Sequence, residues 1–561
     1  MLMQRLVEYA GRLNLPPPMY DKTPVKWIID LDASGHFKGF VPTSSGKKND
    51  RGKELLAPTL VRSVGIKAKL LCDNAEYCLG TPREDSDPAR VALCHEAFAS
   101  LVKRCAETTR ELAVKGVQSF LENLDVAQLP LPIDFSAGDI VTFRVEGIFP
   151  IELPSVQRFW AEETGAAASS GGGFFCLACG TPCEPTDRMP VKIKRIPGGQ
   201  PSGTTIVSAN AAAFESFGLE ASRTSPLCQN CAELHAKGLN DLLERESTRI
   251  FLGPTAYVFW TREETPFSVA SLLSDPQPEE VKRVLASAIK GTEADSDLTP
   301  FYAAAFSASG GRVVVRDWLE TTLFHARRHL SRWFTIQKLV ESDGSEGRPI
   351  GLFPLASSLV RDPRKDLSPN TPKALLRTAL HGGPLPFSLL FEAVKRNRAE
   401  QALTRPRVAL IKMVFLSQQE HVEEGFMEKL DLENKSPAYL CGRLLAELEA
   451  LQYAALGKTN TTVTSRFYGT ASSAPASVFG RLMRGAQAHL AKLRTTKPGT
   501  HEALQQKLEE IQSGLASYPL VLTLEEQGLF ALGYYHQRAK DRADRKDYAE
   551  AKRAEGAETE L

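Results

Sequence analysis

The spacing of apolar and polar positions divides the chain into a mixed first part and a helical second part. Short runs of β-branched or aromatic residues, each flanked by Gly, Pro or Asp, are typical of strands. Such runs occur at 27–32, 36–41, 139–148, 255–260 and 311–317. Longer segments with apolar residues at helical spacing predict helices at 89–107 and 317–334. We therefore expect an α+β fold in residues 1–345.

Beyond Pro363 the strand-like runs disappear, and helical patterns follow one another almost without interruption. The predicted helices cover 371–380, 386–399, 405–417, 436–456, 475–494, 501–514 and 524–552. Thr523 and Glu526 have the spacing of a capping box, in which each side chain binds the other residue's backbone amide. Residues 363–561 are therefore predicted to form an all-α helical-bundle domain after the α+β domain.

Composition indicates an ordinary globular chain of 561 residues, 42% apolar and 24% charged, with room for two or more domains. Lys and Arg total 68 against 67 Asp and Glu, so any electrostatic function needs unevenly distributed charge. No apolar run reaches the roughly 20 residues of a bilayer span. Gln4, Arg5 and Glu8 stand where a secretory signal would be apolar. We expect a soluble, cytoplasmic protein that does not bind membranes.

Two CxxC pairs, Cys176 with Cys179 and Cys228 with Cys231, are the most specific local motif. Four thiolates can complete a tetrahedral zinc site, and such a site leaves no position for a reactive water. We therefore expect structural zinc that clamps the ends of an insertion at about residues 176–231. Cys183 and His235 are alternative ligands. Ordinary reduced thiols without metal are the alternative interpretation.

An acid-free stretch lies in the helical part, between Ala450 and His501. It contains no Asp or Glu, although the whole chain carries 67 of them. Its cations are Lys458, Arg466, Arg481, Arg484, Lys492, Arg494 and Lys497. Cations without neighbouring carboxylates favour binding to a phosphate backbone, because each phosphate contact releases condensed counterions. A solvated helix face is the alternative interpretation.

A second basic stretch runs from Lys373 to Lys412, with only Glu392 and Glu400 as carboxylates. Its cations are Lys373, Arg377, Lys395, Arg396, Arg398, Arg405, Arg407 and Lys412. Two such stretches in a chain of net charge +1 favour a nucleic-acid partner.

The α+β part holds two basic, Gly-rich segments, at 44–77 and 188–210. The glycines at 198, 199 and 203 permit close backbone approach to a ligand. Gln200, Asn74 and the neighbouring lysines can hydrogen-bond base edges. A plain surface turn is the alternative for such a loop.

No catalytic motif is recognisable in the sequence. We find no phosphate-loop motif, no HExxH, no nucleophile elbow and no His-Asp pair of the metal-nuclease kind. His95, His325 and His329 stand alone on helical patterns, where a packed or exposed role is expected. We therefore expect a protein that is not an enzyme.

Six segments resemble one known family, the Csd-type large subunit of the type I-C CRISPR effector complex, Cascade. In chain order they are 62–80, 192–218, 311–323, 375–400, 465–493 and 524–538. The resemblance covers essentially the whole chain. A complete four-cysteine set is not a feature of every member, so the zinc prediction rests on this chain's own spacing.

The resemblance implies a non-catalytic recognition subunit in antiviral defence. Such a subunit sits at the end of the complex that carries the 5′ handle of the guide RNA. It reads a short, thymine-rich protospacer-adjacent motif (PAM) in target double-stranded DNA and promotes unwinding, and a helicase-nuclease is then recruited. Its other partners would be the backbone and handle-processing subunits. Guide pairing supplies most of the specificity in this arrangement, so the protein needs only a few base contacts together with phosphate binding.

Candidate nucleic-acid contacts follow from charge, amide chemistry and loop context. In the α+β part they are Lys47, Lys48, Asn49, Arg51, Lys67, Asn74, Lys192, Lys194, Arg195 and Gln200. In the helical part they are Lys458, Arg466, Arg481, Arg484, Lys492 and Arg494. Phe467 and Tyr468 can stack on bases, although core packing is the alternative.

The family also implies a separately translated small subunit made from an internal start. Met427 is the candidate, because the codons of the preceding Glu423, Glu424 and Gly425 can spell a purine-rich ribosome-binding sequence. The product would comprise residues 427–561. The alternative is that Met427 is only a helix residue.

Two functions of other classes remain open at this point. One is a metal-dependent nuclease whose carboxylates are not recognisable in a single sequence. The other is a zinc-stapled scaffold that contacts only proteins.

Overall fold

A computed structural model describes residues 1–44, 50–60, 62, 65–83, 85–165, 173–208, 211–290, 298–423 and 425–558. Contacts between residues divide the chain into two compact units, one of residues 1–244 and 308–314 and one of residues 245–307 and 315–561. This division falls before the boundary predicted between 345 and 363, because strands at 249–322 share a hydrophobic core with the helices that follow. The functional domains predicted at 1–345 and 363–561 remain a prediction.

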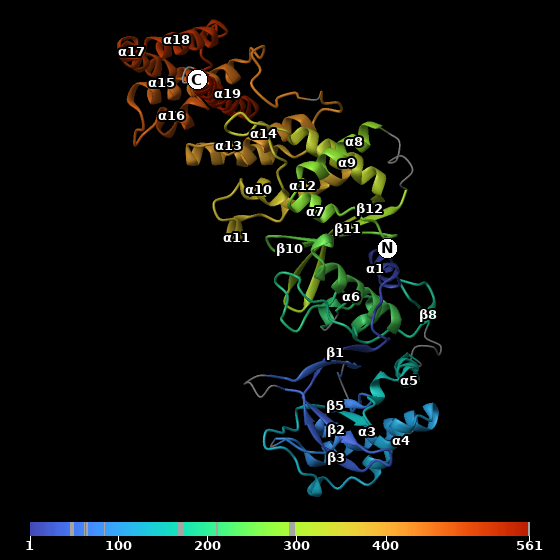
Figure 1. Cartoon of the computed structure of the whole chain (residues 1–561). Coiled ribbons are helices and arrows are strands. Elements are labelled where there is room, and N and C mark those ends of the chain that lie inside the picture. The colour runs from blue at the N-terminus through green and yellow to red at the C-terminus, as the bar shows by residue number, and fades with distance from the viewer. Residues whose placement is uncertain are drawn as a thin grey trace. The chain divides into compact units, whose positions relative to one another are not determined.

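The first unit is built on a four-stranded sheet in the order β3-β2-β6-β5 (Figure 1). Its strands are β2 (Trp27–Leu31), β3 (Phe37–Pro42), β5 (Cys72–Asn74) and β6 (Ile140–Val145). Strand β2 pairs antiparallel with β3 and parallel with β6, and β5 is antiparallel to β6. The long connection that a parallel pair requires contains α2 (Ala75–Cys78), α3 (Pro88–Thr109) and α4 (Leu112–Glu122). Helices α3 and α4 share a buried core with the sheet, and α4 contacts β2 and β6.

The first unit also contains two two-stranded sheets and further helices, one of which carries Cys231. They are α1 (Leu2–Ala10), β1 (Tyr20–Val25), β4 (Lys53–Pro58), α5 (Pro154–Gly165), β7 (Phe174–Phe175), β8 (Pro182–Cys183) and α6 (Gln229–Glu244). A buried ion pair on α6 joins Glu233 to Lys237 at 2.6 Å. The Glu233 carboxylate accepts the backbone N–H of Met19, and the Lys237 ammonium donates to the carbonyl of Tyr20. These bonds tie the helix that carries Cys231 to the start of β1.

The second unit begins with an antiparallel sheet in the order β12-β11-β10-β9. The strands are β9 (Arg249–Leu252), β10 (Thr255–Thr261), β11 (Pro300–Ser309) and β12 (Arg312–Thr322). The helix predicted at 317–334 is wrong in its first third, since β12 continues to Thr322 and α9 begins at Leu323. Thr322 has extended backbone angles, and its hydroxyl caps α9 by accepting the N–H of His325.

Helices make up the regular structure after β12 in the part of the chain that the structure describes, as predicted. The helices of this unit before the bundle are α7 (Val269–Ser274), α8 (Pro278–Lys290), α9 (Leu323–Gln337), α10 (Leu352–Ser357), α11 (Pro363–Asp366), α12 (Asn370–His381), α13 (Phe387–Glu400) and α14 (Arg405–Ser417). The bundle helices are α15 (Pro437–Leu456), α16 (Val463–Ala471), α17 (Phe479–Thr496), α18 (Pro498–Ser513) and α19 (Leu524–Glu558). The predicted capping box is confirmed, because the Thr523 N–H donates to Glu526 Oε2 at 2.7 Å and the Glu526 N–H to Thr523 Oγ1 at 3.3 Å.

Two glycines let α15 and α19 approach closely. A Cβ at Gly442 would lie 2.1 Å from the carbonyl oxygen of Phe530, and one at Gly533 would lie 2.1 Å from that of Tyr439. Replacement of Gly442 by Ala is therefore expected to lower the free energy of unfolding by about 2 kcal/mol, because a backbone carbonyl has to move. Urea unfolding measures this change. A Cβ at Gly485 on α17 would meet no atom of the described residues within 4 Å, so Gly485→Ala should be neutral or stabilising; equal effects of both variants would contradict the prediction.

A polar layer lies inside the bundle, between α15 and α19. Burial and the neighbouring Asp541 raise the pKa of Glu447 to about 8. Glu447 Oε2 and Asp541 Oδ2 are both buried, and neither has a hydrogen-bond partner among the described residues. A proton on Glu447 would satisfy both atoms, since the protonated acid can donate to Asp541.

The pair of Glu447 and Asp541 predicts that the free energy of unfolding depends on pH. An unfolded Glu loses its proton near pH 4.3, whereas folded Glu447 keeps it up to about pH 8, so the folded state binds the extra proton between these values. The contribution to the free energy of unfolding should fall by about 1.4 kcal/mol per pH unit from about pH 5 to pH 8. Glu447→Gln should abolish this part of the slope, measured by urea unfolding against pH, while Glu509→Gln on the surface of α18 should retain it. An unchanged slope in Glu447→Gln would refute the assignment.

Candidate metal centre and candidate nucleic-acid interface

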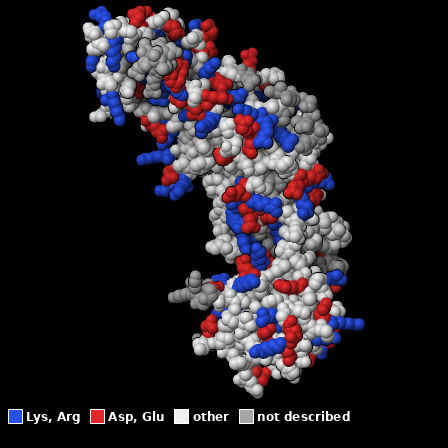
Figure 2. Space-filling model, viewed as in Figure 1, with Lys and Arg blue, Asp and Glu red and all other residues white. Residues whose placement is uncertain are grey.

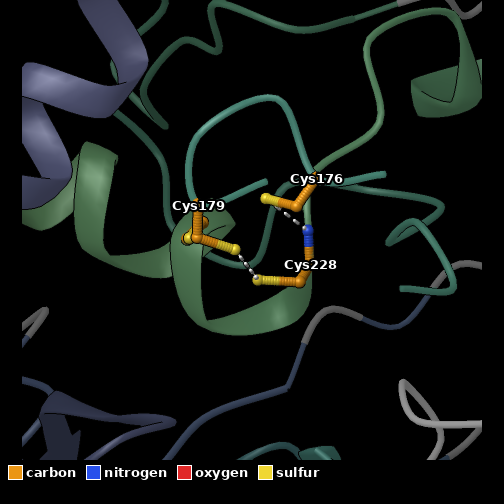
Figure 3. A group of neighbouring side chains, drawn as sticks. Cys176, Cys179 and Cys228 are labelled. Atoms are coloured by element: carbon orange, nitrogen blue, oxygen red, sulfur yellow. Dashed lines mark hydrogen bonds between the residues drawn. The ribbon is translucent and has the colours of Figure 1, made fainter. Parts of the chain in front are cut away.

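The structure brings the four predicted cysteines together. Their sulfur atoms all lie within 4.8 Å of one another, and the Sγ atoms of Cys179 and Cys228 are 4.0 Å apart (Figure 3). Four sulfurs around zinc at about 2.3 Å would be about 3.8 Å apart, so the cluster fits a tetrahedral ion after a small contraction. Cys176 and Cys231 are buried and Cys179 is exposed, which leaves one side of the cluster open to solvent.

Local backbone geometry explains this convergence. Cys176 follows β7, and a tight turn returns the chain toward β8, with the Gly180 N–H donating to the Cys176 carbonyl at 2.8 Å. Gly180 has φ 74°, a left-handed angle that glycine adopts without strain. Cys228 immediately precedes α6, and Cys231 lies in its first turn. The Cys228 N–H donates to Cys176 Sγ at 3.4 Å, the kind of contact that stabilises a thiolate ligand.

The protonation of the cluster favours a cation. A hydrogen bond from the Cys231 thiol lowers the pKa of Cys228 to about 5, and the same contact raises the pKa of Cys231. The cysteines of the cluster therefore share protons, which keep some of the sulfurs as neutral thiols. A bound metal would displace these protons, because metals bind the thiolate form. The donor set is all sulfur, which suits zinc and leaves no position for water.

The two alternative ligands do not belong to the cluster. Cys183 is buried at the end of β8, and burial together with the charges of the neighbouring thiols raises its pKa to about 11. His235 is buried one turn after Cys231, and its Nδ1 lies 3.0 Å from the Cys231 carbonyl oxygen. His235 therefore supports the backbone of a ligand.

The cations of the acid-free stretch lie on the outer side of the bundle. On α17, Leu482, Ala486, Leu490 and Leu493 are buried at helical spacing, which turns the charged residues outward. Arg466 of α16 and Arg481, Arg484, Lys492 and Arg494 of α17 are exposed and form the α17 basic surface. Figure 2 shows Lys and Arg side chains at the edge of the molecule where α17 lies. None of the five forms an ion pair with any residue that the structure describes.

The second basic stretch does not form the free surface that its composition predicts. Arg377 pairs with Asp317 at 2.9 Å, and Arg396 pairs with Glu400 at 2.5 Å. Arg407 is 3% exposed and also pairs with Glu400. The remaining pairs and anchors are Arg405 with Glu341, Lys395 with Glu392, and buried Lys412 with the carbonyl of Lys338. Most cations of this stretch therefore stabilise the fold.

The two aromatic candidates differ in exposure. Tyr468 is 1% exposed and packs edge-on against Phe530 and Tyr534, so it belongs to the core and cannot stack on a base. Phe467 is partly buried, with the guanidinium groups of Arg466 and Arg481 5.7 and 5.8 Å from the ring centre. Phe467 thus holds two cations of the α17 basic surface by cation–π contacts.

The first Gly-rich segment is described only in part. Lys47, Lys48 and Asn49 lie outside the described residues. Arg51 and Lys67 are exposed. Asn74 ends β5 and caps α2, because its Oδ1 accepts the N–H of Tyr77 at 3.2 Å, so its amide oxygen is already used.

The second Gly-rich segment packs against residues 308–314, at the turn between β11 and β12. The Gln200 N–H donates to the Gly310 carbonyl at 3.1 Å. A Cβ at Gly198 would lie 2.9 Å from the Ala308 carbonyl oxygen, so the close approach that the sequence indicated is to the protein's own backbone. Among the candidate readers Lys192, Lys194, Arg195 and Gln200 are exposed, and Arg195 pairs with Glu244 at 3.1 Å.

A cavity of about 570 Å³ brings together cations from distant parts of the first unit. Lys67 and Arg188 line it. Burial lowers the pKa of Lys192, and the positive charge of the nearby Arg188 lowers it further. Arg104 and Arg223 also line it, but they pair with carboxylates at 2.6 and 3.0 Å. Sequence spacing missed Arg188, because only the fold places it near Lys67.

Met427 lies in the connection between α14 and α15, with a left-handed φ of 56°, and is not a helix residue. A chain that started there would contain all of α15–α19.

No helix within the described residues combines the length and apolar character of a membrane span. A family model described as CRISPR-associated protein (Cas_Csd1) matches residues 4–541. No curated protein matches the chain.

Proposed function

Because the chain belongs to the Cas_Csd1 family of CRISPR-associated proteins, we propose that it is the non-catalytic large subunit of a type I-C effector complex. The match across residues 4–541 carries this proposal, and it confirms the family resemblance predicted from the sequence. In this role the chain binds the handle end of the guide RNA, recognises the PAM in duplex DNA, promotes unwinding and recruits the helicase-nuclease. We place these steps in the cytoplasm, with the backbone and handle-processing subunits as partners.

Two features of the structure support this division of labour. The α17 basic surface offers cations without carboxylate partners among the described residues, which suits a nucleic-acid backbone. In the first unit, the cavity with Lys67 and Arg188 and the exposed Lys192 and Lys194 provide donors for a duplex. The four-cysteine cluster would hold structural zinc through Cys176, Cys179, Cys228 and Cys231, and zinc would fix the segment that carries Lys192 and Lys194.

We also propose that residues 427–561 are made separately as the small subunit. The position of Met427 in a connection supports this, since the product would keep whole helices. Changing Met427 to Leu should remove a short product detected by an antibody to the C-terminus. A short product that persists, or a gene without a purine-rich run before this codon, would refute it.

Binding of a target duplex by the reconstituted guide-RNA complex tests the main proposal. The complex is prepared with and without this chain, and the duplex carries a matched or a scrambled PAM. Tight binding should require both the chain and the matched motif. Binding that is unchanged without the chain would overturn the recognition role.

A second assay separates this proposal from an enzymatic one. The purified complex is incubated with target DNA and magnesium or manganese, without the helicase-nuclease. Intact DNA is the expected result. Cleavage that one carboxylate substitution in this chain abolishes would establish a nuclease instead.

A further inference from the structure

A pocket between α15, the loop that follows it and α19 carries a second group of cations. It has a volume of about 410 Å³, within the range of small-molecule sites. Lys458 comes from the loop, and Arg538, Arg542 and Arg545 come from α19. The three arginines lie four and three residues apart, so they share one face of the helix.

The carboxylates at this pocket are already engaged. Glu449 Oε2 accepts the Tyr534 hydroxyl at 2.6 Å and lies 3.6 Å from Arg538 Nε. Asp541 is 4% exposed, and its Oδ1 lies 2.6 Å from the ammonium of Lys507. The two carboxylates therefore pair with Arg538 and with Lys507, which is outside the pocket lining, and neither forms an ion pair with the other pocket cations.

The other two arginines donate hydrogen bonds to neutral groups. Arg542 Nη1 donates to the Ser342 carbonyl at 3.1 Å, and Arg545 Nε donates to the Asp541 carbonyl at 3.0 Å. Within the described part of the chain, neither arginine forms an ion pair, and neither does Lys458. Most of the five N–H donors of each guanidinium thus remain available.

Repulsion between like charges destabilises this arrangement of arginines when no anion is bound. Burial lowers the pKa of Arg542 and the positive charges of Arg538 and Arg545 lower it further, which outweighs the opposite effect of Tyr534 and Glu449. An anion in the pocket would reverse this repulsion, and planar guanidinium groups suit the paired oxygens of a phosphate.

An aromatic ring stands beside these cations. Tyr453 lines the pocket from α15 and remains 57% exposed. Base–aromatic stacking is a common way to hold a nucleobase, and stacking beside arginines matches a base linked to a phosphate.

We propose that this pocket binds a nucleoside phosphate, with Arg542, Arg545 and Lys458 on the phosphate and Tyr453 on the base. The ligand can be a free nucleotide or one unit of a nucleic-acid strand, since both present the same chemistry. The site is separate from the α17 basic surface, and it does not depend on the role proposed for the chain in an effector complex.

Binding of ATP, of inorganic phosphate and of a twelve-residue oligothymidylate to the full-length chain, measured by calorimetry, tests the proposal. Arg542→Ala should weaken ATP or oligonucleotide binding about tenfold or more, because hydrogen bonds to a charged group are lost. Lys540→Gln is the matched control, since Lys540 lies on the same helix but pairs with Asp544 outside the pocket. Tyr453→Leu should weaken the binding of ATP and of the oligothymidylate. Circular dichroism shows that each variant is folded.

Each outcome of these measurements either supports or overturns the proposed nucleotide site. ATP binding that Arg542→Ala and Tyr453→Leu weaken supports the proposal with a free nucleotide as ligand. Oligonucleotide binding alone, with the same sensitivity, supports it with a strand as ligand. Inorganic phosphate bound as tightly as ATP, without an effect of Tyr453→Leu, overturns the nucleotide assignment. Absence of saturable binding, or an equal loss in Lys540→Gln, overturns the site. Charge reversal of Arg481 and Arg484 should leave ATP binding unchanged, so failure here is distinct from failure of the proposed function.

Discussion

Replacement of Cys231 by Ser is expected to release zinc and to unfold the segment between β7 and α6. The sulfurs of the four cysteines converge within 4.8 Å, and Cys231 is one of the two buried members. Structural zinc contributes about 10–16 kcal/mol of apparent binding free energy in small peptides, so even partial loss is a large effect. A loss of about 4 kcal/mol would lower the melting temperature of the first unit by roughly 10 °C. Mass spectrometry of bound metal, thermal unfolding and limited proteolysis near residues 176–231 measure the three consequences.

Cys183→Ala provides the matched control for this prediction. Cys183 is buried in the same small core but is not one of the four clustered cysteines. The control should keep one zinc per chain and should lose little stability. Protein purified without metal, or equal melting temperatures for wild type and Cys231→Ser, would contradict a structural zinc site.

Local sequence patterns predicted those elements whose residues strongly prefer one type of secondary structure. Strand β2 was predicted because Trp27, Ile28 and Ile29 are consecutive buried residues of β character. Strand β11 was missed, since its centre is the alanine run Ala303–Ala305, and alanine is depleted in strands. Pairing with β10 on one side and β12 on the other selects the extended form there. Helix α16 was missed because its nine residues include three of Ser or Thr, which compete with the helix for hydrogen bonds.

The same distinction applies to the candidate sites. The cysteine cluster was found because the spacing of two ligands within a knuckle is a local property, and the fold joined the two knuckles. Charge counts failed for the second basic stretch, since the partners of its cations, such as Asp317 and Glu341, lie outside that stretch. The pocket arginines on α19 were missed for the opposite reason. Acidic residues surround them in sequence, but the fold directs Asp541 toward Lys507.

Reversal of three charges on α17, Arg481→Glu, Arg484→Glu and Lys492→Glu, is expected to have the largest effect on nucleic-acid binding. These side chains are exposed and form no ion pair with described residues, so the substitutions leave no carboxylate unpaired. We expect the affinity of the assembled complex for target DNA to fall roughly 10²- to 10³-fold near 0.15 M salt. The slope of log affinity against log salt should decrease by about 2 if three contacts are made to a single strand. Filter binding or fluorescence anisotropy at several salt concentrations measures both quantities.

The same charge change elsewhere on the second unit is the control, in Arg361→Glu, Arg364→Glu and Lys365→Glu. These residues are also exposed, but they lie outside the acid-free stretch. If net charge alone mattered, both triple variants would lose affinity equally, and the assignment of the α17 basic surface would fail. A loss confined to the α17 variant, with an unchanged melting temperature, locates the phosphate contacts on that helix. A loss of affinity without a change in the salt slope would instead indicate that the substitutions disturb a protein contact, which is the behaviour expected of a scaffold.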